Sequence, residues 1–326
     1  MYRRRRSHGN GSRAGITTTI EEIRMANKKI GFIGVGMMGH GMAKNLAQKG
    51  FPTTVLGHKN RAPVEDLVKL GANEAKDLTE LVKASEIIFI CVTGSPQVED
   101  LIYRKGGILE SSSAGQIVVD TSTAQPGSTL KIAADLKAKG VRFADAPLAR
   151  TPVEAEQGRL NTMVGADEAT FGDIEPALKA FCENIFHIGE VGAGHKIKLI
   201  NNCAAIGQMS LIAEALTACA KLGVDPKKYF ALVSTGAANS GIFQMLAGKA
   251  VEGDYSGMKF GLANALKDVR YYNQMAMEFG VSGAMATATL QTLTQAVNMG
   301  FGGPEHLVAS LVPAVAKINN TPFPPQ

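Results

Sequence analysis

The chain has 326 residues, of which 45% are hydrophobic and 19% are charged. This composition is typical of a globular protein, and the length allows two domains with separate cores. Disordered and fibrous classes are excluded, and no uninterrupted apolar run reaches the ~18 residues of a membrane span. The same absence of a span means that no membrane partner is expected. The four cysteines lack metal-ligand or disulfide spacing, so we expect a reducing cytoplasm and no metal site.

The net charge of +5 lies mainly at the N-terminus, where the first 24 residues hold six arginines against Glu21 and Glu22. The remainder is nearly neutral, so no nucleic-acid surface is expected on the folded part. Residues 1–27 are predicted to be a disordered basic extension, because their Ser, Gly and Arg content cannot bury enough apolar area.

From residue 28 onward, short apolar runs alternate with amphipathic segments, which is the pattern of βαβ units. The predicted strands are Ile30–Ile33, Thr53–Leu56, Ile87–Val92, Ile117–Asp120, Arg142–Ala144, Asn161–Val164 and Asn184–His187. The predicted helices between them are Gly39–Lys49, Val64–Leu70, Leu78–Lys83, Thr129–Lys139 and Ala169–Phe181. We therefore expect an α/β domain over residues 28–191, with a mostly parallel, doubly wound sheet that binds ligands at the carboxyl ends of its strands.

Strand-like runs end near Gly194, and residues 192–320 are predicted to form an all-helical C-terminal domain for substrate binding and dimerisation. The predicted helices are Lys196–Leu222, Pro226–Ser234, Gly241–Val251, Lys259–Phe279, Ala284–Met299 and Glu305–Asn319. The apolar surface of the first of these favours a homodimer or homotetramer, although burial in a core explains it equally well.

A glycine motif follows the first strand directly and precedes the first helix. Its residues are Gly34, Val35, Gly36, Met37, Met38 and Gly39. In this spacing the first glycine permits a tight turn, the second leaves room for a pyrophosphate at the helix N-terminus, and the third allows helix and strand to approach. The context predicts a Rossmann dinucleotide site.

The segment after the second strand bears on the choice between NAD and NADP. An acidic residue there would bind the ribose hydroxyls, but the chain has Gly57 followed by His58, Lys59 and Arg61. Positive charge in this position suits a 2′-phosphate, so NADP is preferred over NAD.

A lysine and an asparagine share one face near the start of the long helix. Lys198 and Asn202 are four residues apart, and the apolar residues beside them predict burial. Burial depresses the pKa of a lysine, which suits proton transfer to a carbonyl oxygen.

Several motifs occur in order over residues 28–320: the glycine loop, Asp120-Thr121-Ser122-Thr123, Asp145-Ala146-Pro147, Met163-Val164-Gly165, Lys198 to Asn202, and Lys267-Asp268. This combination resembles the β-hydroxyacid dehydrogenase family, which includes 3-hydroxyisobutyrate dehydrogenase and 2-hydroxy-3-oxopropionate (tartronate semialdehyde) reductase. The resemblance implies NAD(P)-dependent interconversion of a small anionic β-hydroxy acid and its semialdehyde.

The resemblance also implies residue roles. Lys198 would be the general acid/base and Asn202 would support the reacting oxygen. Ser122 would contact the substrate carboxylate, with Asn201 beside it. The cofactor would be contacted by Thr93, Gly94, Thr123 and Lys267.

One segment departs from the family pattern. Typical members have Ser-Gly-Gly after the Asp-Ala-Pro element, where this chain has Leu148-Ala149-Arg150-Thr151. Arg150 and Thr151 can bind an anion by several hydrogen bonds and resemble the sulfolactaldehyde reductase branch. Ala205 stands where that branch has a serine, which leaves succinic semialdehyde reduction as a further alternative.

Other activities are possible on the same architecture. 6-Phosphogluconate dehydrogenase chemistry is disfavoured because the chain lacks the Lys-x-x-His-Asn arrangement. Imine reductases commonly lack the lysine that is present here. A non-catalytic NADP-binding protein is the alternative of a different class.

Overall fold

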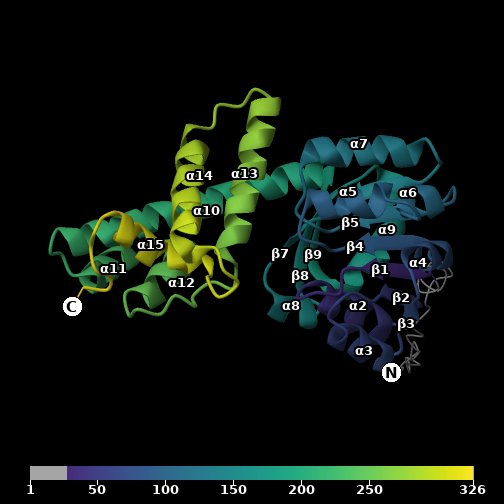
Figure 1. Cartoon of the computed structure of the whole chain (residues 1–326), viewed down its shortest axis with the longest axis horizontal. Coiled ribbons are helices and arrows are strands. Elements are labelled where there is room, and N and C mark those ends of the chain that lie inside the picture. The colour runs from purple at the N-terminus through teal and green to yellow at the C-terminus, as the bar shows by residue number, and fades with distance from the viewer. Residues whose placement is uncertain (1–27, 326) are drawn as a thin grey trace, which may run out of the picture.

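A computed structural model describes residues 28–325 of the chain. The predicted basic extension, residues 1–27, lies outside these residues. The described part contains one nine-stranded sheet followed by a helical region (Figure 1). The strands are β1 (Ile30–Ile33), β2 (Thr53–Leu56), β3 (Asn73–Ala75), β4 (Ile87–Ile90), β5 (Ile117–Asp120), β6 (Arg142–Asp145), β7 (Leu148–Ala149), β8 (Leu160–Gly165) and β9 (Cys182–Gly189).

The order of the strands creates the ligand-binding edge of the sheet. They are arranged β3-β2-β1-β4-β5-β6-β8-β7, with β9 also paired to β8. The pairs from β3 to β6 are all parallel, whereas β8 runs antiparallel to β6 and β7. Chain order reverses between β1 and β4, and such a switch point is where doubly wound sheets bind ligands. The predicted fold class is confirmed.

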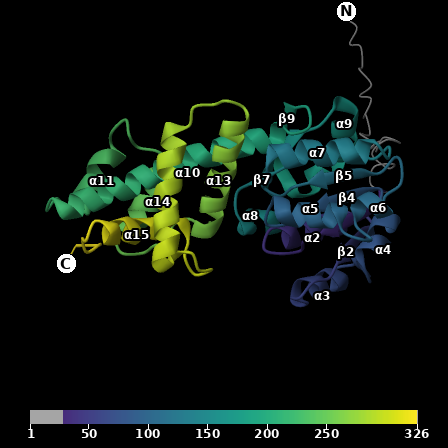
Figure 2. The ribbon, with the colours of Figure 1, turned by 45° about the horizontal axis from the view of Figure 1, so that its top comes forward.

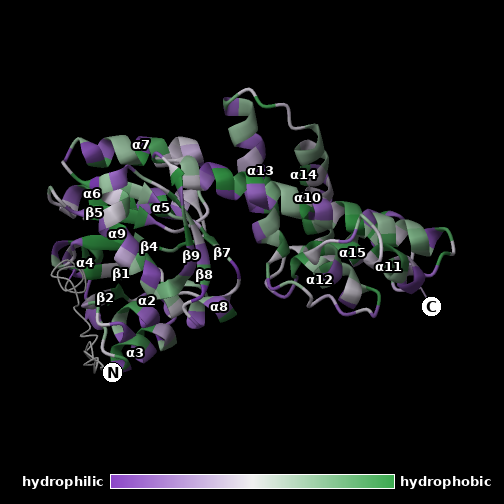
Figure 3. Ribbon diagram, turned by 180° about the vertical axis from the view of Figure 1, so that it is seen from behind, coloured by the Kyte–Doolittle hydropathy of each residue, from purple (hydrophilic) through white to green (hydrophobic). Residues whose placement is uncertain are grey.

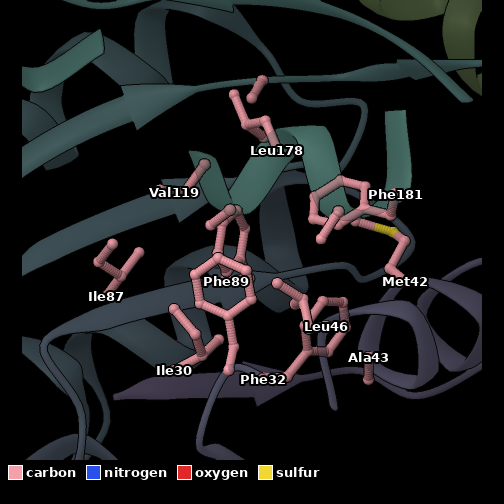
Figure 4. Close-up of a cluster of buried hydrophobic side chains, with 14 of the residues drawn as sticks. Ile30, Phe32, Met42, Ala43, Leu46, Ile87, Phe89, Val119, Leu178 and Phe181 are labelled. Carbon is pink, nitrogen blue, oxygen red and sulfur yellow. The ribbon is translucent and has the colours of Figure 1, made fainter. Parts of the chain in front are cut away.

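Helices cover both faces of this sheet. They are α2 (Gly39–Gln48), α3 (Ala62–Lys69), α4 (Leu78–Ala84), α5 (Ser95–Tyr103), α6 (Ile108–Ser111), α7 (Pro126–Lys137), α8 (Pro152–Glu156) and α9 (Glu168–Phe181). Alternate residues of the central strands enter two separate cores, so these strands are apolar on both sides. In one core Phe89 stacks on Phe32 and meets the edge of Phe181 from α9 (Figure 4).

The C-terminal region is helical, as predicted. It comprises α10 (Ala193–Lys221), α11 (Pro226–Ser234), α12 (Gly241–Ala250), α13 (Leu262–Glu278), α14 (Ala284–Ala296), a π-helical turn (Val297–Phe301), a 3-10 turn (Val308–Ser310) and α15 (Leu311–Ile318). The helix α10 runs from the sheet into this region, where α13 and α14 cross it (Figures 1 and 2).

Among residues 28–325, α10 is the one helix that is long and apolar enough to cross a membrane, since it has 29 residues and a mean hydropathy of 1.4 in its most apolar window. Our expectation from uninterrupted apolar runs missed this, because polar residues are interspersed along the helix (Figure 3). Its residues Ile206, Ala213 and Leu216 pack with α12, α13 and α15 in the core of the helical region. One face of α10 therefore lies in this core, although only 33% of its most apolar window is buried.

Several elements differ from the sequence prediction. The strands β3 and β7 were missed because they are short, and β3 has the polar sequence Asn-Glu-Ala. The helices α5, α6 and α8 were missed as well, although α5 and α8 carry proline in their first turn, a position that favours a helix start. The predicted helix Ala284–Met299 ends at Ala296 in a π-helical turn in which Gly300 has a φ of 100°. The predicted helix Glu305–Asn319 starts only at Leu311.

Candidate active site

The glycine loop joins β1 to α2 and is shaped by close backbone contacts. Gly34 has a φ of +97°, and a Cβ there would lie 2.1 Å from the Cys91 carbonyl oxygen. A Cβ on Gly39 would lie 2.0 Å from the Gly34 carbonyl oxygen, whereas one on Gly36 would meet nothing within 4 Å. The first turn of α2 has no side-chain cap and no acidic residue. The loop therefore fits the pyrophosphate of a dinucleotide, which the free N–H groups would bind.

A cavity of about 640 Å³ lies beside this loop on the β2 side. Gly34, Val35, Gly57, His58 and residues of α5 line it. Its position at the end of β2 fits the adenosine half of the cofactor.

Two of the basic residues predicted near the 2′-phosphate do not line this cavity themselves, although Arg61 lies against Gly57, which does. Lys59 and Arg61 are not among the residues that line this cavity. Arg61 donates two hydrogen bonds, of 2.6 and 2.8 Å, to the Glu74 carboxylate on β3, and this pairing lowers the pKa of Glu74. Arg61 and Glu74 are 13 residues apart, so the sequence pattern did not show that this guanidinium is already paired with a carboxylate.

A second cavity, of about 460 Å³, extends from the glycine loop to α10 and α13. Its wall combines residues from the sheet region with residues from the helical region. The predicted site residues in it are Gly36, Met37, Met38, Gly39, Thr93, Ser122, Thr123, Arg150, Lys198, Asn202 and Lys267. Gly94 does not line this cavity. It directly precedes α5, and a Cβ on Gly94 would lie 2.8 Å from the Tyr271 hydroxyl.

Ser122 is buried at the end of β5 and held by its neighbours. Its hydroxyl oxygen accepts the Val92 N–H at 3.0 Å, which leaves the hydroxyl hydrogen free to donate. Its own N–H donates to Asp120, and its carbonyl oxygen lies 3.1 Å from Nε2 of the buried His195. His195, which precedes Lys198 by one helical turn, was not predicted as a site residue.

Lys198 points into the second cavity and is only 8% exposed. Burial lowers its pKa, Asp268 opposes this shift, and the positive charge of Lys267 adds to it. Asn202 lies one turn along α10 and donates to Asp268 Oδ2 at 2.7 Å. The lysine and the asparagine therefore reach the same space, with Asp268 behind them.

Asp268 is a buried residue of the site that the sequence prediction omitted, although its neighbour Lys267 was included. Its Oδ1 lies 3.1 Å from Lys267 Nζ and accepts no hydrogen bond from the described residues. Lys267 Nζ donates to the carbonyl oxygens of Thr93 and Thr123, at 2.6 and 3.3 Å. This lysine thereby ties α13 to the two loops that follow β4 and β5. The Lys267-Asp268 pair in the sequence was the signal that could have identified Asp268.

Arg150 lies at the wall shared by the second cavity and a third, outer cavity. Its φ is +82°, a left-handed conformation that is unusual for a residue with a side chain. Its guanidinium pairs with Glu183 and donates to the Arg159 carbonyl oxygen at 2.5 Å. Both bonds use the same nitrogen, so the remaining guanidinium donors make no hydrogen bond to the described residues.

Thr151 and Asn201 line only the outer cavity, as does Ala205. Thr151 is the N-cap of α8, and its hydroxyl and N–H both bond Glu154 in a capping box. Thr151 thus has a local role at the start of α8, and its Thr-x-x-Glu spacing to Glu154 was the signal for it.

Comparison with known proteins agrees with this geometry. Residues 29–189 match the model of the NAD binding domain of 6-phosphogluconate dehydrogenase, and residues 192–312 match the NAD-binding model of NADP-dependent 3-hydroxyisobutyrate dehydrogenase. The chain is 34% identical to 2-(hydroxymethyl)glutarate dehydrogenase of Eubacterium barkeri, over 84% of this chain and 91% of that protein. It is 33% identical to 2-hydroxy-3-oxopropionate reductase of Escherichia coli, over 90% of this chain and 98% of that protein.

A solved structure has the same fold. The 3-hydroxyisobutyrate dehydrogenase of Salmonella typhimurium superposes with a TM-score of 0.76 at 26% identity, covering 88% of this chain and 99% of that one. The two family models match the sheet region and the helical region in turn, and the relatives align over most of the chain. Together these matches show an NAD(P)-dependent oxidoreductase. The chain therefore belongs to the β-hydroxyacid dehydrogenase family.

Proposed function

We propose that this protein interconverts a small β-hydroxy acid and its semialdehyde, with Lys198 as the general acid/base. The observation that carries the proposal is the buried Lys198, which shares a cavity with Asn202 and with the glycine loop. The named relatives, which act on hydroxy acids or their semialdehydes, support the same class of substrate.

A bound nicotinamide would supply hydride to the carbonyl carbon, or accept it in the oxidation. Lys198 donates a proton to the carbonyl oxygen during reduction and removes it from the hydroxyl during oxidation. Burial lowers the pKa of Lys198 below that of an ordinary lysine, which makes the ammonium a stronger acid for the first of these steps. Asn202, held by Asp268, orients the reacting oxygen.

We assign the substrate carboxylate to Ser122 and Arg150. Ser122 has a free hydroxyl hydrogen, and Arg150 faces the cavity with donors left over from its Glu183 pair. Thr151 and Asn201 contact substrate atoms on the outer side, since both line the outer cavity. Arg150 can bind a carboxylate or a sulfonate, so succinic semialdehyde and sulfolactaldehyde belong among the candidates.

We further propose that NADP is preferred over NAD. No carboxylate follows β2 directly, and His58 and Asn60 line the adenosine cavity. Thr93, Gly94, Thr123 and Lys267 are assigned to the nicotinamide side. The description of the second family model as NADP-dependent supports this preference.

A cytoplasmic homodimer or homotetramer is proposed for the assembly. All four cysteines are free, and α10 leaves Leu211 62% exposed, while Leu222 just after it is 78% exposed. Light scattering during size-exclusion chromatography measures the mass directly, and a monomer at micromolar concentration would contradict this part of the proposal.

The test of the reaction is initial rates of NADPH and NADH oxidation with succinic, methylmalonic and tartronate semialdehydes and with sulfolactaldehyde. Lys198→Ala is measured beside the wild type, and NADPH binding is followed by fluorescence. We expect turnover of at least one aldehyde by the wild type, and loss of turnover with unchanged NADPH binding in the variant. If the wild type binds NADPH but reduces none of the four aldehydes, the proposal is overturned and a non-catalytic role is favoured.

A further inference from the structure

The outer cavity is larger than a small semialdehyde requires. Its volume is about 800 Å³, and Arg150, Lys198, Asn202, Lys259 and Phe260 line both this cavity and the second one. The outer cavity therefore opens directly onto the proposed catalytic lysine. Cavities of roughly 300–1,000 Å³ hold ligands much larger than a four-carbon acid.

Three of the six charged side chains on the wall of this cavity have partners within the wall. Arg150 is bound to Glu183, and Glu154 accepts the N–H and hydroxyl of Thr151. Both carboxylates of the wall and the Arg150 guanidinium are therefore engaged.

Two further cations on the same wall, Arg159 and Lys259, form no ion pair with the described residues. Arg159 donates its Nε and Nη2 hydrogens to the neutral side chain of Gln157, and its charge helps to lower the pKa of Glu154. Lys259 forms no hydrogen bond and no ion pair with any residue between 28 and 325. The rim of the outer cavity thus carries positive charge that forms no ion pair. This charge is additional to Arg150, which we assign to the substrate carboxylate next to the reacting group.

The loop that carries Lys259 is fixed by its backbone. A Cβ on Gly257 would lie 2.2 Å from the Met245 carbonyl oxygen of α12, so the loop packs directly on that helix. The Phe260 carbonyl oxygen accepts the Val308 N–H at 2.7 Å. Lys259 is therefore held at the rim, although its side chain is exposed.

Part of the wall of the outer cavity is apolar. Ile206 and Met209 of α10, Met245 of α12 and Met258 line it. A ligand that reaches Lys259 along these side chains needs an apolar middle and an anionic far end. This is the pattern of an acid with two separated carboxylates.

We propose that Lys259, assisted by Arg159, forms a second anion subsite, and that the substrate is a dianionic β-hydroxy acid or semialdehyde. The carbon next to its reacting group carries an aliphatic arm that ends in a second carboxylate. This inference rests on the proposed function and specifies its substrate class.

Three substrates that differ only in this arm test the subsite in the oxidation direction. They are 3-hydroxyisobutyrate, with a methyl arm, 2-(hydroxymethyl)pentanoate, with a neutral propyl arm, and 2-(hydroxymethyl)glutarate, with a carboxyethyl arm. At low salt we expect the carboxyethyl substrate to have a KM about fivefold below that of the propyl substrate, the effect of one exposed ion pair. The advantage should shrink in high salt, because exposed charges are screened.

Lys259→Met should remove this advantage and leave kcat and the propyl substrate unchanged, whereas Lys259→Arg should retain it. Lys76→Met, which removes an exposed lysine from the loop after β3, is the matched control and should behave as the wild type. Equal KM values for the propyl and carboxyethyl substrates in the wild type would overturn the subsite, as would equal effects of the two Met variants.

A binding measurement separates this inference from the proposed function. Isothermal titration of the NADP-loaded wild type and Lys259→Met with the same two acids does not depend on turnover. If neither acid is oxidised but the wild type alone prefers the dianion, the proposed reaction fails and the subsite stands. If all forms bind the two acids equally, the subsite is wrong, whatever the activity.

Discussion

The carboxylate of Asp145, at the end of β6, accepts the backbone N–H of His195 at 2.6 Å. Its other oxygen accepts the Gly192 N–H, also at 2.6 Å, so one buried side chain binds two amides at the start of α10. A Cβ on Gly194 would lie 2.3 Å from the Met163 carbonyl oxygen, which shows how closely this turn packs on the sheet. The sheet thereby fixes the first turn of the helix whose second turn presents Lys198.

Asp145→Asn should lower both stability and turnover. The variant replaces one acceptor oxygen with an amide that faces an N–H donor, which costs about 1–3 kcal/mol in the free energy of unfolding. Because α10 then loses its anchor, Lys198 shifts and kcat falls. Urea unfolding and steady-state rates measure the two effects.

The matched control for this variant is Asp167→Ala, which removes the side-chain N-cap of α9 at a residue that lines none of the three cavities. Asp167 accepts the Thr170 N–H at 2.7 Å, so this variant should lose about 1 kcal/mol of stability with an unchanged kcat. Equal losses of kcat in both variants would show that general destabilisation, rather than the anchoring of α10, affects the rate.

The pH dependence of turnover should have opposite signs in the two directions. Reduction requires the Lys198 ammonium as acid, so its kcat falls as the pH rises through the lysine pKa. Oxidation requires the free amine, so its kcat rises through the same pKa. Burial lowers this pKa, and both inflections should therefore lie below the ordinary lysine value of 10.5. Matching slopes in the two directions would contradict the assigned role.

The same pKa shift affects stability. Between the folded and the unfolded pKa of Lys198 the unfolded chain binds more protons, so this residue makes the free energy of unfolding increase with pH in that window. Urea midpoints of the wild type and Lys198→Met, compared across the window, measure the contribution, which should be absent in the variant.

Gly57→Asp should turn the cofactor preference toward NAD. It places a carboxylate directly after β2, where it can accept hydrogen bonds from ribose hydroxyls and repels a 2′-phosphate. A Cβ at Gly57 would meet only the ends of the Arg61 and Glu74 side chains, at 2.2 and 2.5 Å, and these can move. We expect kcat/KM for NADPH to fall by about tenfold or more relative to NADH, a change of ~1.4 kcal/mol.

Asn73→Asp supplies the same charge change on the neighbouring exposed strand end and serves as its control. A similar loss of NADPH selectivity in this control would indicate a general electrostatic effect instead of a contact with the cofactor.

Arg150→Gly should separate stability from substrate binding. Glycine relieves the positive φ of +82° and removes the pair with Glu183, two opposing effects of about 1 kcal/mol each, so the free energy of unfolding changes little. The KM for an anionic substrate should rise about tenfold, since a charge-assisted contact is lost.

Asn320→Gly provides the comparison, because Asn320 is the other non-glycine residue of the described chain with a positive φ. It should leave KM unchanged. An unaltered KM in Arg150→Gly would exclude Arg150 from the substrate site and favour a purely structural pair with Glu183.

The local features of this protein follow from its sequence because they depend on neighbours along the chain. The strand Ile30–Ile33, the glycine loop and the four-residue spacing of Lys198 and Asn202 are all set by backbone geometry over a few residues. The short strand β3 has no such signal, since three polar residues become a strand only by pairing with β2.

The contacts that shape the site were decided by the tertiary structure alone. Nothing near Arg61 in the sequence shows that Glu74 will bind it, or that Arg150 will meet Glu183 across 33 residues. Asp145 and His195 are 50 residues apart, and Asp268 is 66 residues from Asn202. Such pairs form because parallel strands end at one edge of the sheet, α10 packs against the sheet and α13 packs on α10. Their partners therefore follow from the assembly of elements and not from any local pattern.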